Sequence, residues 1–313
     1  MCTSDWRFVF GIRESKTILN KDETVTSSNL DNHPMFGRIA LGCAAVFLVA
    51  GLLYSYRLQP QVLHELKLWP VVLLIFIGVP LTLCLNAVEF GILARLGRVR
   101  ISLLKALEIT LLGSAANLLP LPGSTLVRVA ALKAGGAPLF KGTSSTIVVG
   151  VIWIAVAFGY SGGWMLAIAN GLVAWLFLAI GALVLLGCVI WWRLLEGGYL
   201  LLLWMLNTRL LLVIVDSARL YLCFAALGVE ASFAQASGLA VAGVLGSAVS
   251  IVPAGLGVRE GVAAAISPVV GLAAAFGFLS AFLNRLAGLV IIAPLAAILS
   301  LRNSGRKVDA DRS

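Results

Sequence analysis

The sequence predicts an all-α, polytopic integral membrane protein with six full spans and two re-entrant hairpins, arranged as an inverted repeat. The prediction rests on composition, on apolar segments of spanning length, and on a motif that occurs twice. The chain of 313 residues is 60% hydrophobic and only 12% charged, with a mean hydropathy of +1.02. A soluble domain is roughly a quarter charged. So few charges cannot cover a soluble surface, which excludes a soluble enzyme, a disordered regulator and a nucleic-acid-binding module.

Six apolar segments are long enough to span a membrane as helices, which takes about twenty residues each. They are Ile39–Tyr56, Trp69–Leu96, two segments within 142–192, Tyr199–Leu227 and Gly271–Leu301. We expect Pro80 to kink the second span. Because residues 142–192 carry no charge, we expect two spans there, with the turn between them at Ser161-Gly162-Gly163. The transmembrane domain is therefore predicted over residues 37–301.

Two further apolar segments end in helix-breaking residues rather than in charges. Ile101–Leu119 runs into Pro120-Leu121-Pro122-Gly123, and Ser232–Val252 runs into Pro253-Ala254-Gly255. We expect each segment to enter the membrane, break, and return as a short helix. Broken backbone at membrane depth is tolerated only where protein or water covers it, so the two tips are predicted to meet in a polar cavity.

The second half of the chain repeats the first at a shift of 131 residues. At this shift Leu96-Gly97 falls on Leu227-Gly228, Pro122 falls on Pro253, and Val127-Arg128 falls on Val258-Arg259. The repeats extend over about 69–160 and 199–301. Such a duplication with broken helices is typical of transporters, in which the substrate site lies near the midplane.

The distribution of basic residues predicts the orientation. Residues 95–105 contain four basic residues and no acidic one, which places this segment in the cytoplasm. The two hairpins then enter from opposite faces, and both termini are cytoplasmic. Residues 1–36 are polar and carry both charges, so they are predicted to form a largely disordered cytoplasmic tail, and residues 302–313 form a basic one. We expect the protein in the inner (plasma) membrane.

The residues around the two breaks are the candidate ligand-binding residues. A helix N-terminus with free amides and a nearby guanidinium group suits a phosphate or another anion. The simpler alternative is that each arginine pairs with a neighbouring acid, and that the side chain of Asn117 bonds freed carbonyl groups. The candidates are Asn117, Ser124, Thr125 and Arg128 at the first break, and Gly255, Gly257, Arg259 and Glu260 at the second.

Four other charged residues lie within apolar segments and are candidate cavity charges: Glu89, Asp216, Arg219 and Arg285. A charge inside the membrane is costly and needs a partner. Asp216 and Arg219, three residues apart on one helix, are expected to neutralise each other, and a pair between Glu89 and Arg219 across the repeats is an alternative.

The residue inventory offers little for catalysis, so we expect no enzyme, no metal site and no cofactor. The two histidines, His33 and His64, both lie outside the apolar segments, which excludes a histidine-based zinc site or serine triad in the membrane. The sequence contains no nucleotide-binding loop of the Gly-x4-Gly-Lys-Ser/Thr kind.

The segment Pro253–Gly261, which reads PAGLGVREG, resembles the signature of the lysylphosphatidylglycerol synthase transmembrane-region family, and Asn117–Arg128 resembles its first motif. The family forms the flippase part of the bacterial multiple peptide resistance factors and also occurs as stand-alone proteins. Two departures concern the first repeat. Ser124-Thr125-Leu126 stands where members usually have an acidic residue, and Val149–Trp153 replaces a Glu-Arg pair.

The resemblance implies a flippase or transporter that moves or presents an anionic phospholipid or a lipid-linked headgroup. Only a dozen mostly polar residues follow Leu301, so we expect no aminoacyl-transferase activity. The alternative is an accessory membrane subunit that delivers lipid to a separate glycosyltransferase or aminoacyl transferase. A membrane enzyme that acts on lipid is a third, weaker alternative.

Overall fold

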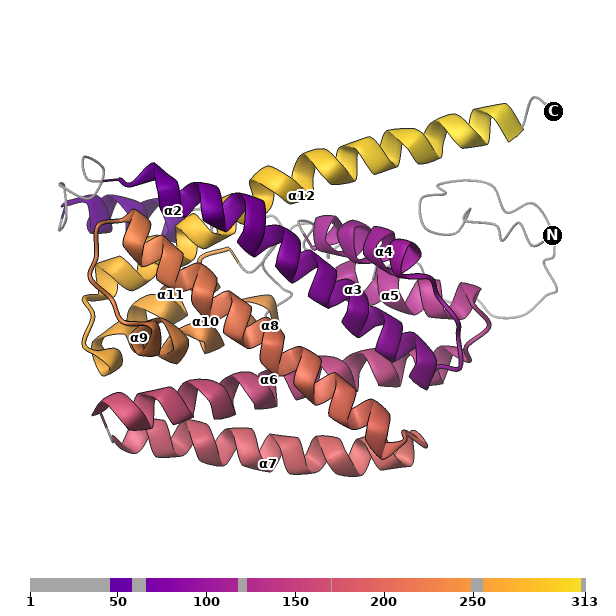
Figure 1. The fold of residues 1–313 in the computed structure, drawn as a ribbon, viewed down its shortest axis with the longest axis horizontal. Coiled ribbons are helices and arrows are strands. Elements are labelled where there is room, and N and C mark those ends of the chain that lie inside the picture. Colours follow the sequence, from indigo (N-terminus) through magenta and orange to yellow (C-terminus); the bar gives the residue numbers. More distant parts are fainter. Residues whose placement is uncertain (1–45, 58–65, 118–122, 170, 249–255, 311–313) are drawn as a thin grey trace, which may run out of the picture.

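A computed structural model describes residues 46–57, 66–117, 123–169, 171–248 and 256–310. Side chains are described up to residue 299. The described residues are helical apart from short turns (Figure 1). The predicted N-terminal tail 1–36, the first part of the first predicted span (residues 39–45) and the breaker residues Pro120–Pro122 and Pro253–Gly255 lie outside the described residues. The last helix, α12 (Ala274–Ala310), continues into the segment predicted as a basic tail.

Five described helices are long and apolar enough to cross a membrane, and they correspond to five of the six predicted spans. They are Leu68–Leu96, which comprises α2 (Leu68–Leu73), η3 (Leu74–Gly78) and α3 (Val79–Leu96), then α6 (Leu139–Ala169), α7 (Leu172–Leu194), α8 (Tyr199–Ala226) and the apolar part of α12 (Ala274–Leu299). Of the remaining predicted span, the described part is the helix Val46–Arg57.

The two segments that end in breakers form helices too short to cross the membrane. The first consists of α4 (Leu103–Ala116) and α5 (Gly123–Ala134), and the second of α9 (Phe233–Gly238), α10 (Ala240–Ala248) and α11 (Val258–Ile266). Even the longest, α4 with 14 residues, extends only about 21 Å. Helices α4 and α5 pack side by side (Figure 1), because Gly113 lets the chain at Ser124 approach closely.

The turn predicted at Ser161-Gly162-Gly163 is wrong. Helix α6 continues through these residues to Ala169, and α7 begins at Leu172. Gly162 is buried where α6 packs on α7, and a Cβ atom there would lie 2.9 Å from the backbone nitrogen of Leu178. Small residues inside a membrane helix permit such close packing, and here that role outweighs their tendency to form turns.

Ser161 also explains why the second short segment is divided into α9 and α10. Its hydroxyl donates to the carbonyl of Ser237 over 3.0 Å and accepts the amide of Val241 over 3.2 Å. In an uninterrupted helix that amide would donate to that carbonyl, four residues earlier. The hydroxyl from α6 therefore bridges the interrupted hydrogen bond, and it ties α9 and α10 to α6.

The predicted disturbance near Pro80 takes the form of a π-helical turn. Residues Leu74–Gly78 form η3 within the continuous helix 68–96, directly before the proline in α3. A proline removes one backbone donor, and a π turn is one way in which a helix accommodates this. Gly78 in this turn lies against Arg219, because a Cβ atom there would be 2.8 Å from the arginine Cγ.

The two sequence repeats can be compared at the ends of their helices. Helices α3 and α8 end at Leu96 and Ala226, and the next helices in each repeat are capped by the hydroxyls of Ser102 and Ser232. The two helix ends are 130 residues apart, and so are the two capping serines. The arginines beyond the breaks, Arg128 and Arg259, are 131 residues apart. The second repeat therefore has one extra residue between its cap and its arginine.

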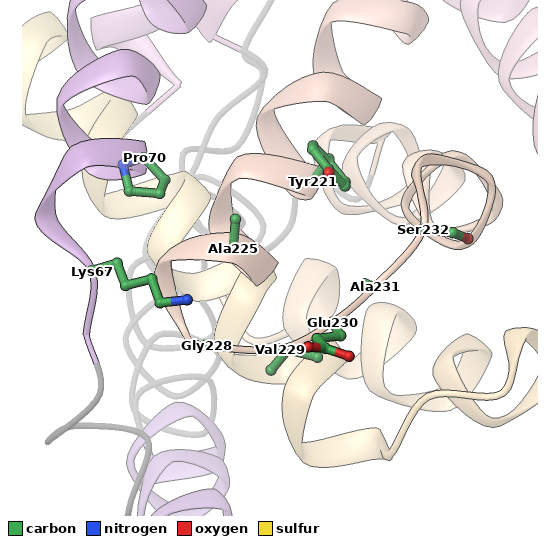
Figure 2. Close-up of a pocket in the computed structure, with 9 residues that line it drawn as sticks. All are labelled: Lys67, Pro70, Tyr221, Ala225, Gly228, Val229, Glu230, Ala231 and Ser232. Atoms are coloured by element: carbon green, nitrogen blue, oxygen red, sulfur yellow. The ribbon is translucent and has the colours of Figure 1, made fainter.

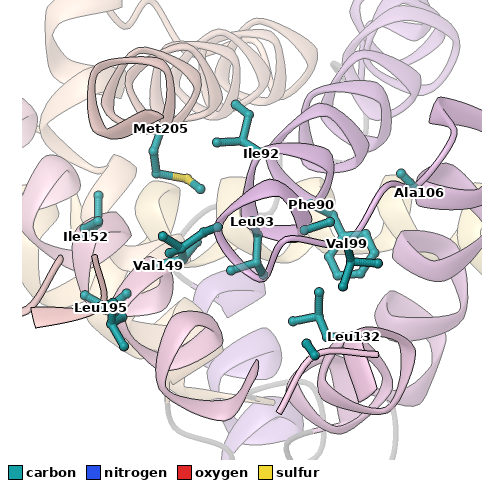
Figure 3. Close-up of a cluster of buried hydrophobic side chains, with 14 of the residues drawn as sticks. Phe90, Ile92, Leu93, Val99, Ala106, Leu132, Val149, Ile152, Leu195 and Met205 are labelled. Atoms are coloured by element: carbon teal, nitrogen blue, oxygen red, sulfur yellow. The ribbon is translucent and has the colours of Figure 1, made fainter. Parts of the chain in front are cut away.

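The basic segment 95–105 follows α3 at one end of the helices, where α7 also ends and α8 begins (Figure 1). There Glu196 lies 3.5 Å from Arg98 and 3.6 Å from Lys141. Lys105 and Glu108 of α4 form an ion pair at 2.8 Å, three residues apart on the helix. An apolar core packs α3 against its neighbours close to this end, and Figure 3 shows Phe90 and Leu93 of α3 facing side chains of α5 and α6.

Candidate functional site

The first charged cluster consists of Glu89, Arg128 and Arg209. Glu89 of α3 is completely buried; its Oε1 accepts a hydrogen bond from Arg128 Nη1 over 2.9 Å, and its Oε2 forms an ion pair with Arg209 Nη1 at 2.9 Å. Arg128 comes from α5, which follows the first break, and Arg209 comes from α8. The carboxylate therefore joins both repeats. The alternative pair between Glu89 and Arg219 is not formed, because Glu89 pairs with Arg128 and Arg209.

Aromatic rings complete the surroundings of both arginines. The guanidinium carbon of Arg128 lies 5.8 Å from the ring centre of Phe90, and that of Arg209 lies 5.1 Å from the ring centre of Trp153. The sequence analysis missed Arg209. A signal was available, since an arginine in the middle of an apolar helix is a functional candidate by default.

The second charged cluster consists of Asp216, Arg219, Arg259, Glu260, Asn284 and Arg285. Asp216 of α8 accepts from Arg259 of α11 over 3.2 Å and from the amide of Asn284 of α12 over 3.2 Å. The charge of Asp216 acts on Arg219 as expected, but the close ion pair of Asp216 is with Arg259. Arg219 instead donates to the hydroxyl of Thr82 over 3.2 Å and to the backbone carbonyl of Asn284 over 3.3 Å.

Glu260 organises the start of α11 within this cluster. Its side chain is completely buried, Oε2 accepts the amide of Gly257 over 3.0 Å, and Oε1 lies 3.2 Å from Arg285 Nε. Gly257 has a φ of 78°, a conformation that favours glycine. The carboxylate thus caps its own helix, at the amide that was predicted to be free for an anion.

The first break has an equivalent cap of different chemistry. The side-chain Oδ1 of Asn117, at the end of α4, accepts the amide of Ser124 over 2.7 Å. Asn117 therefore satisfies an amide at the start of α5. Ser124 and Thr125 lie in the first turn of α5, which starts at Gly123. Gly255, the remaining candidate, lies outside the described residues.

Two glycines of α10 let the second cluster form. A Cβ atom on Gly243 would lie 2.6 Å from Asp216 Oδ2, and one on Gly246 would lie 2.5 Å from Arg259 Cβ. Glycine at these positions therefore lets α10 approach the ion pair of Asp216 and Arg259 closely.

The two clusters lie along the same helix. Arg209 and Asp216 are seven residues apart on α8, which corresponds to two helical turns and about 10 Å. Each cluster also takes one side chain from the opposite repeat: Arg209 in the first cluster and Thr82 in the second. The contact between α3 and α8 is therefore the seam at which the charged groups of both repeats meet.

A pocket of about 480 Å³ lies elsewhere, at the end of α8 beside α2 (Figure 2). Lys67, Tyr221 and Glu230 are among its lining residues, and it contains none of the candidate site residues. Because buried charge in a membrane protein marks function more strongly than a hollow at a helix end, we place the candidate site at the two charged clusters.

Comparison with known proteins supports the resemblance noted above. The chain matches the family described as "Lysylphosphatidylglycerol synthase TM region" over residues 38–296, which includes both breaks and both clusters. No curated protein and no solved structure matches the chain. The family and the five apolar helices identify a membrane protein with a lipid-related role. The chain belongs to the lysylphosphatidylglycerol synthase TM region family.

Proposed function

We propose that this protein moves an anionic lipid headgroup across the membrane, with Arg128 and Arg259 as its charge partners. One observation carries the proposal: each of these arginines, equivalent in the two repeats, is held inside the helix assembly by a carboxylate from the long helix that precedes its break. A guanidinium fork binds phosphate and carboxylate with the same geometry. A headgroup phosphate is therefore a chemically matched replacement for Glu89 or Asp216.

In this proposal the ion pairs act as closed gates. An arriving phosphate competes with the carboxylate, frees it, and allows the short helix that carries the arginine to move. Acyl chains stay in lipid while the headgroup passes between the short helices. Alternate opening of the two repeats then provides access from one face at a time. No bond is made or broken, so the proposed activity is transport rather than catalysis.

The proposed topology has six spans and two re-entrant hairpins that enter from opposite faces of the plasma membrane. The short lengths of α4, α5, α9, α10 and α11 support hairpins that do not cross. The basic end, with Arg98 and Lys141, favours a cytoplasmic position under the positive-inside tendency, and both termini are then cytoplasmic.

The proposal is tested by transport in vesicles. The purified protein is reconstituted into phosphatidylcholine–phosphatidylglycerol vesicles that contain a trace of fluorescent phosphatidylglycerol, and a membrane-impermeant quencher reports the accessible fraction over time. Wild-type protein is expected to move the probe, and Arg259→Gln and Arg128→Gln are expected to reduce the rate at least tenfold.

The matched control is Arg98→Gln, which removes an arginine of an exposed ion pair. It is expected to transport at the wild-type rate. Equal rates for wild type, Arg259→Gln and protein-free vesicles would refute the proposal, provided that the purified protein remains folded by circular dichroism.

A further inference from the structure

The two charged clusters contain more positive than negative charge. In the first cluster one carboxylate, Glu89, faces two arginines. In the second, the carboxylates of Asp216 and Glu260 face three arginines, Arg219, Arg259 and Arg285. Among the residues that the structure describes, each cluster thus has one more positive than negative side chain. The two segments at the breaks, 118–122 and 249–255, lie outside the described residues, and their sequences contain no charged residue that could compensate it.

Buried donors remain for a ligand. Among the described residues, the Nε atoms of Arg128, Arg209, Arg219 and Arg259 are buried without a hydrogen-bond partner. Arg209 and Arg219 are only 3% and 8% exposed. Arginine stays charged inside proteins, and an uncompensated buried charge is costly. The missing component is therefore an anion with several acceptor oxygens.

We infer that the preferred headgroup carries two negative charges on one phosphate group or on adjacent ones, as a phosphomonoester or a diphosphate does. The inference rests on the proposed function and adds the charge of the substrate to it. A phosphodiester, with one negative charge, compensates only one of the two excess charges. A cationic headgroup adds to the excess. Because the clusters are about 10 Å apart along α8 in a medium of low dielectric constant, both act on the same anion.

The experiment measures binding of short-chain lipids with identical tails to the purified full-length protein in neutral detergent at pH 8, where a phosphomonoester is doubly charged. The probes are dioctanoyl phosphatidic acid, dioctanoyl phosphatidylglycerol and dioctanoyl phosphatidylcholine, with inorganic phosphate as the soluble source of the same chemistry. We expect phosphatidic acid to bind at least tenfold more tightly than phosphatidylglycerol, and phosphatidylcholine to bind most weakly.

Variants test whether charge is the cause. Arg219→Gln and Arg209→Gln each remove one excess charge, so the preference for phosphatidic acid over phosphatidylglycerol is expected to fall below threefold. Arg219→Lys keeps the charge and is expected to keep the preference. Arg98→Gln, at an exposed position, is the control that leaves it unchanged.

The outcomes separate this inference from the proposed function. Equal binding of phosphatidic acid and phosphatidylglycerol by wild-type protein would overturn the preference for a doubly charged headgroup. It would leave the proposed transport of anionic lipid intact. Absence of binding by any anionic lipid would overturn both. Binding of inorganic phosphate as tight as that of phosphatidic acid would overturn a lipid as the source of the dianion. The wild-type comparison decides the inference even if a glutamine variant does not fold.

Discussion

The two charged clusters use the same design but differ in how firmly they are closed. In the first, both contacts of Glu89 measure 2.9 Å, and the exposed fractions of the side chains of Glu89, Arg209 and Arg128 are 0%, 4% and 11%. In the second, the contact between Asp216 and Arg259 measures 3.2 Å, and these side chains are 19% and 18% exposed. The difference indicates that the first gate is closed more firmly, whereas the second is the easier one for a ligand to open.

The largest effect is expected from Glu89→Gln, because among the described residues Glu89 is the carboxylate that contacts both buried arginines. Breaking a buried ion pair on one side costs about 3–5 kcal/mol. The matched change Asp216→Asn, at the more exposed site, is expected to cost about 1–3 kcal/mol. Unfolding in detergent with increasing denaturant measures both. Equal destabilisation by the two variants would contradict the conclusion that the first cluster is closed more firmly than the second.

Overpacking tests how closely α10 approaches the second cluster. Gly246→Ala places a methyl group 2.5 Å from Arg259 Cβ, so we expect a cost of about 1–3 kcal/mol and weaker binding of anionic lipid. The control is Gly150→Ala in α6, where nothing lies within 4 Å of the added carbon. That variant is expected to be neutral or slightly stabilising, because alanine is the better helix former. The close approach is absent if both variants behave alike in thermal unfolding.

The hydroxyl of Ser161 is specific to the second hairpin, where it bridges α9 and α10. Ser161→Ala removes two buried hydrogen bonds and is expected to destabilise the protein by about 1–2 kcal/mol. Ser145→Ala, at a buried hydroxyl without a partner in the described part of the chain, is expected to change stability by under about 0.5 kcal/mol. Hydrogen exchange localises the effect, which should appear in residues 233–248; loss of protection elsewhere would argue against the bridge.

The smallest effect is expected at the exposed basic end. Arg98→Gln breaks a 3.5 Å pair with Glu196, and exposed pairs contribute about 0.2–1 kcal/mol at most. Transport and stability are expected to stay near wild type, whereas orientation during membrane insertion responds to the lost charge. A large loss of stability in this variant would show that the exposed end, rather than the two buried clusters, holds the repeats together.

Much of the helix order could be predicted from the sequence. Long apolar segments between charges identify Trp69–Leu96 and Tyr199–Leu227 as spans, because the cost of placing charge in lipid leaves few alternatives. The turn within 142–192 could not be placed in this way. Ser161 and Gly162 are as typical of close helix contacts as of turns, and only the presence of α7 and α10 as neighbours decides between these roles.

For the site, the sequence by itself determined that arginines follow both breaks and that acids lie inside apolar helices, since composition and spacing are local properties. Which acid meets which arginine was decided by the tertiary structure. Glu89 meets Arg128 and Arg209, and Asp216 meets Arg259, because α3 and α8 pack against each other and bring residues of both repeats to one seam. The spacing of residues along a helix predicts neighbours on that helix only, and a pair across helices depends on how the helices pack.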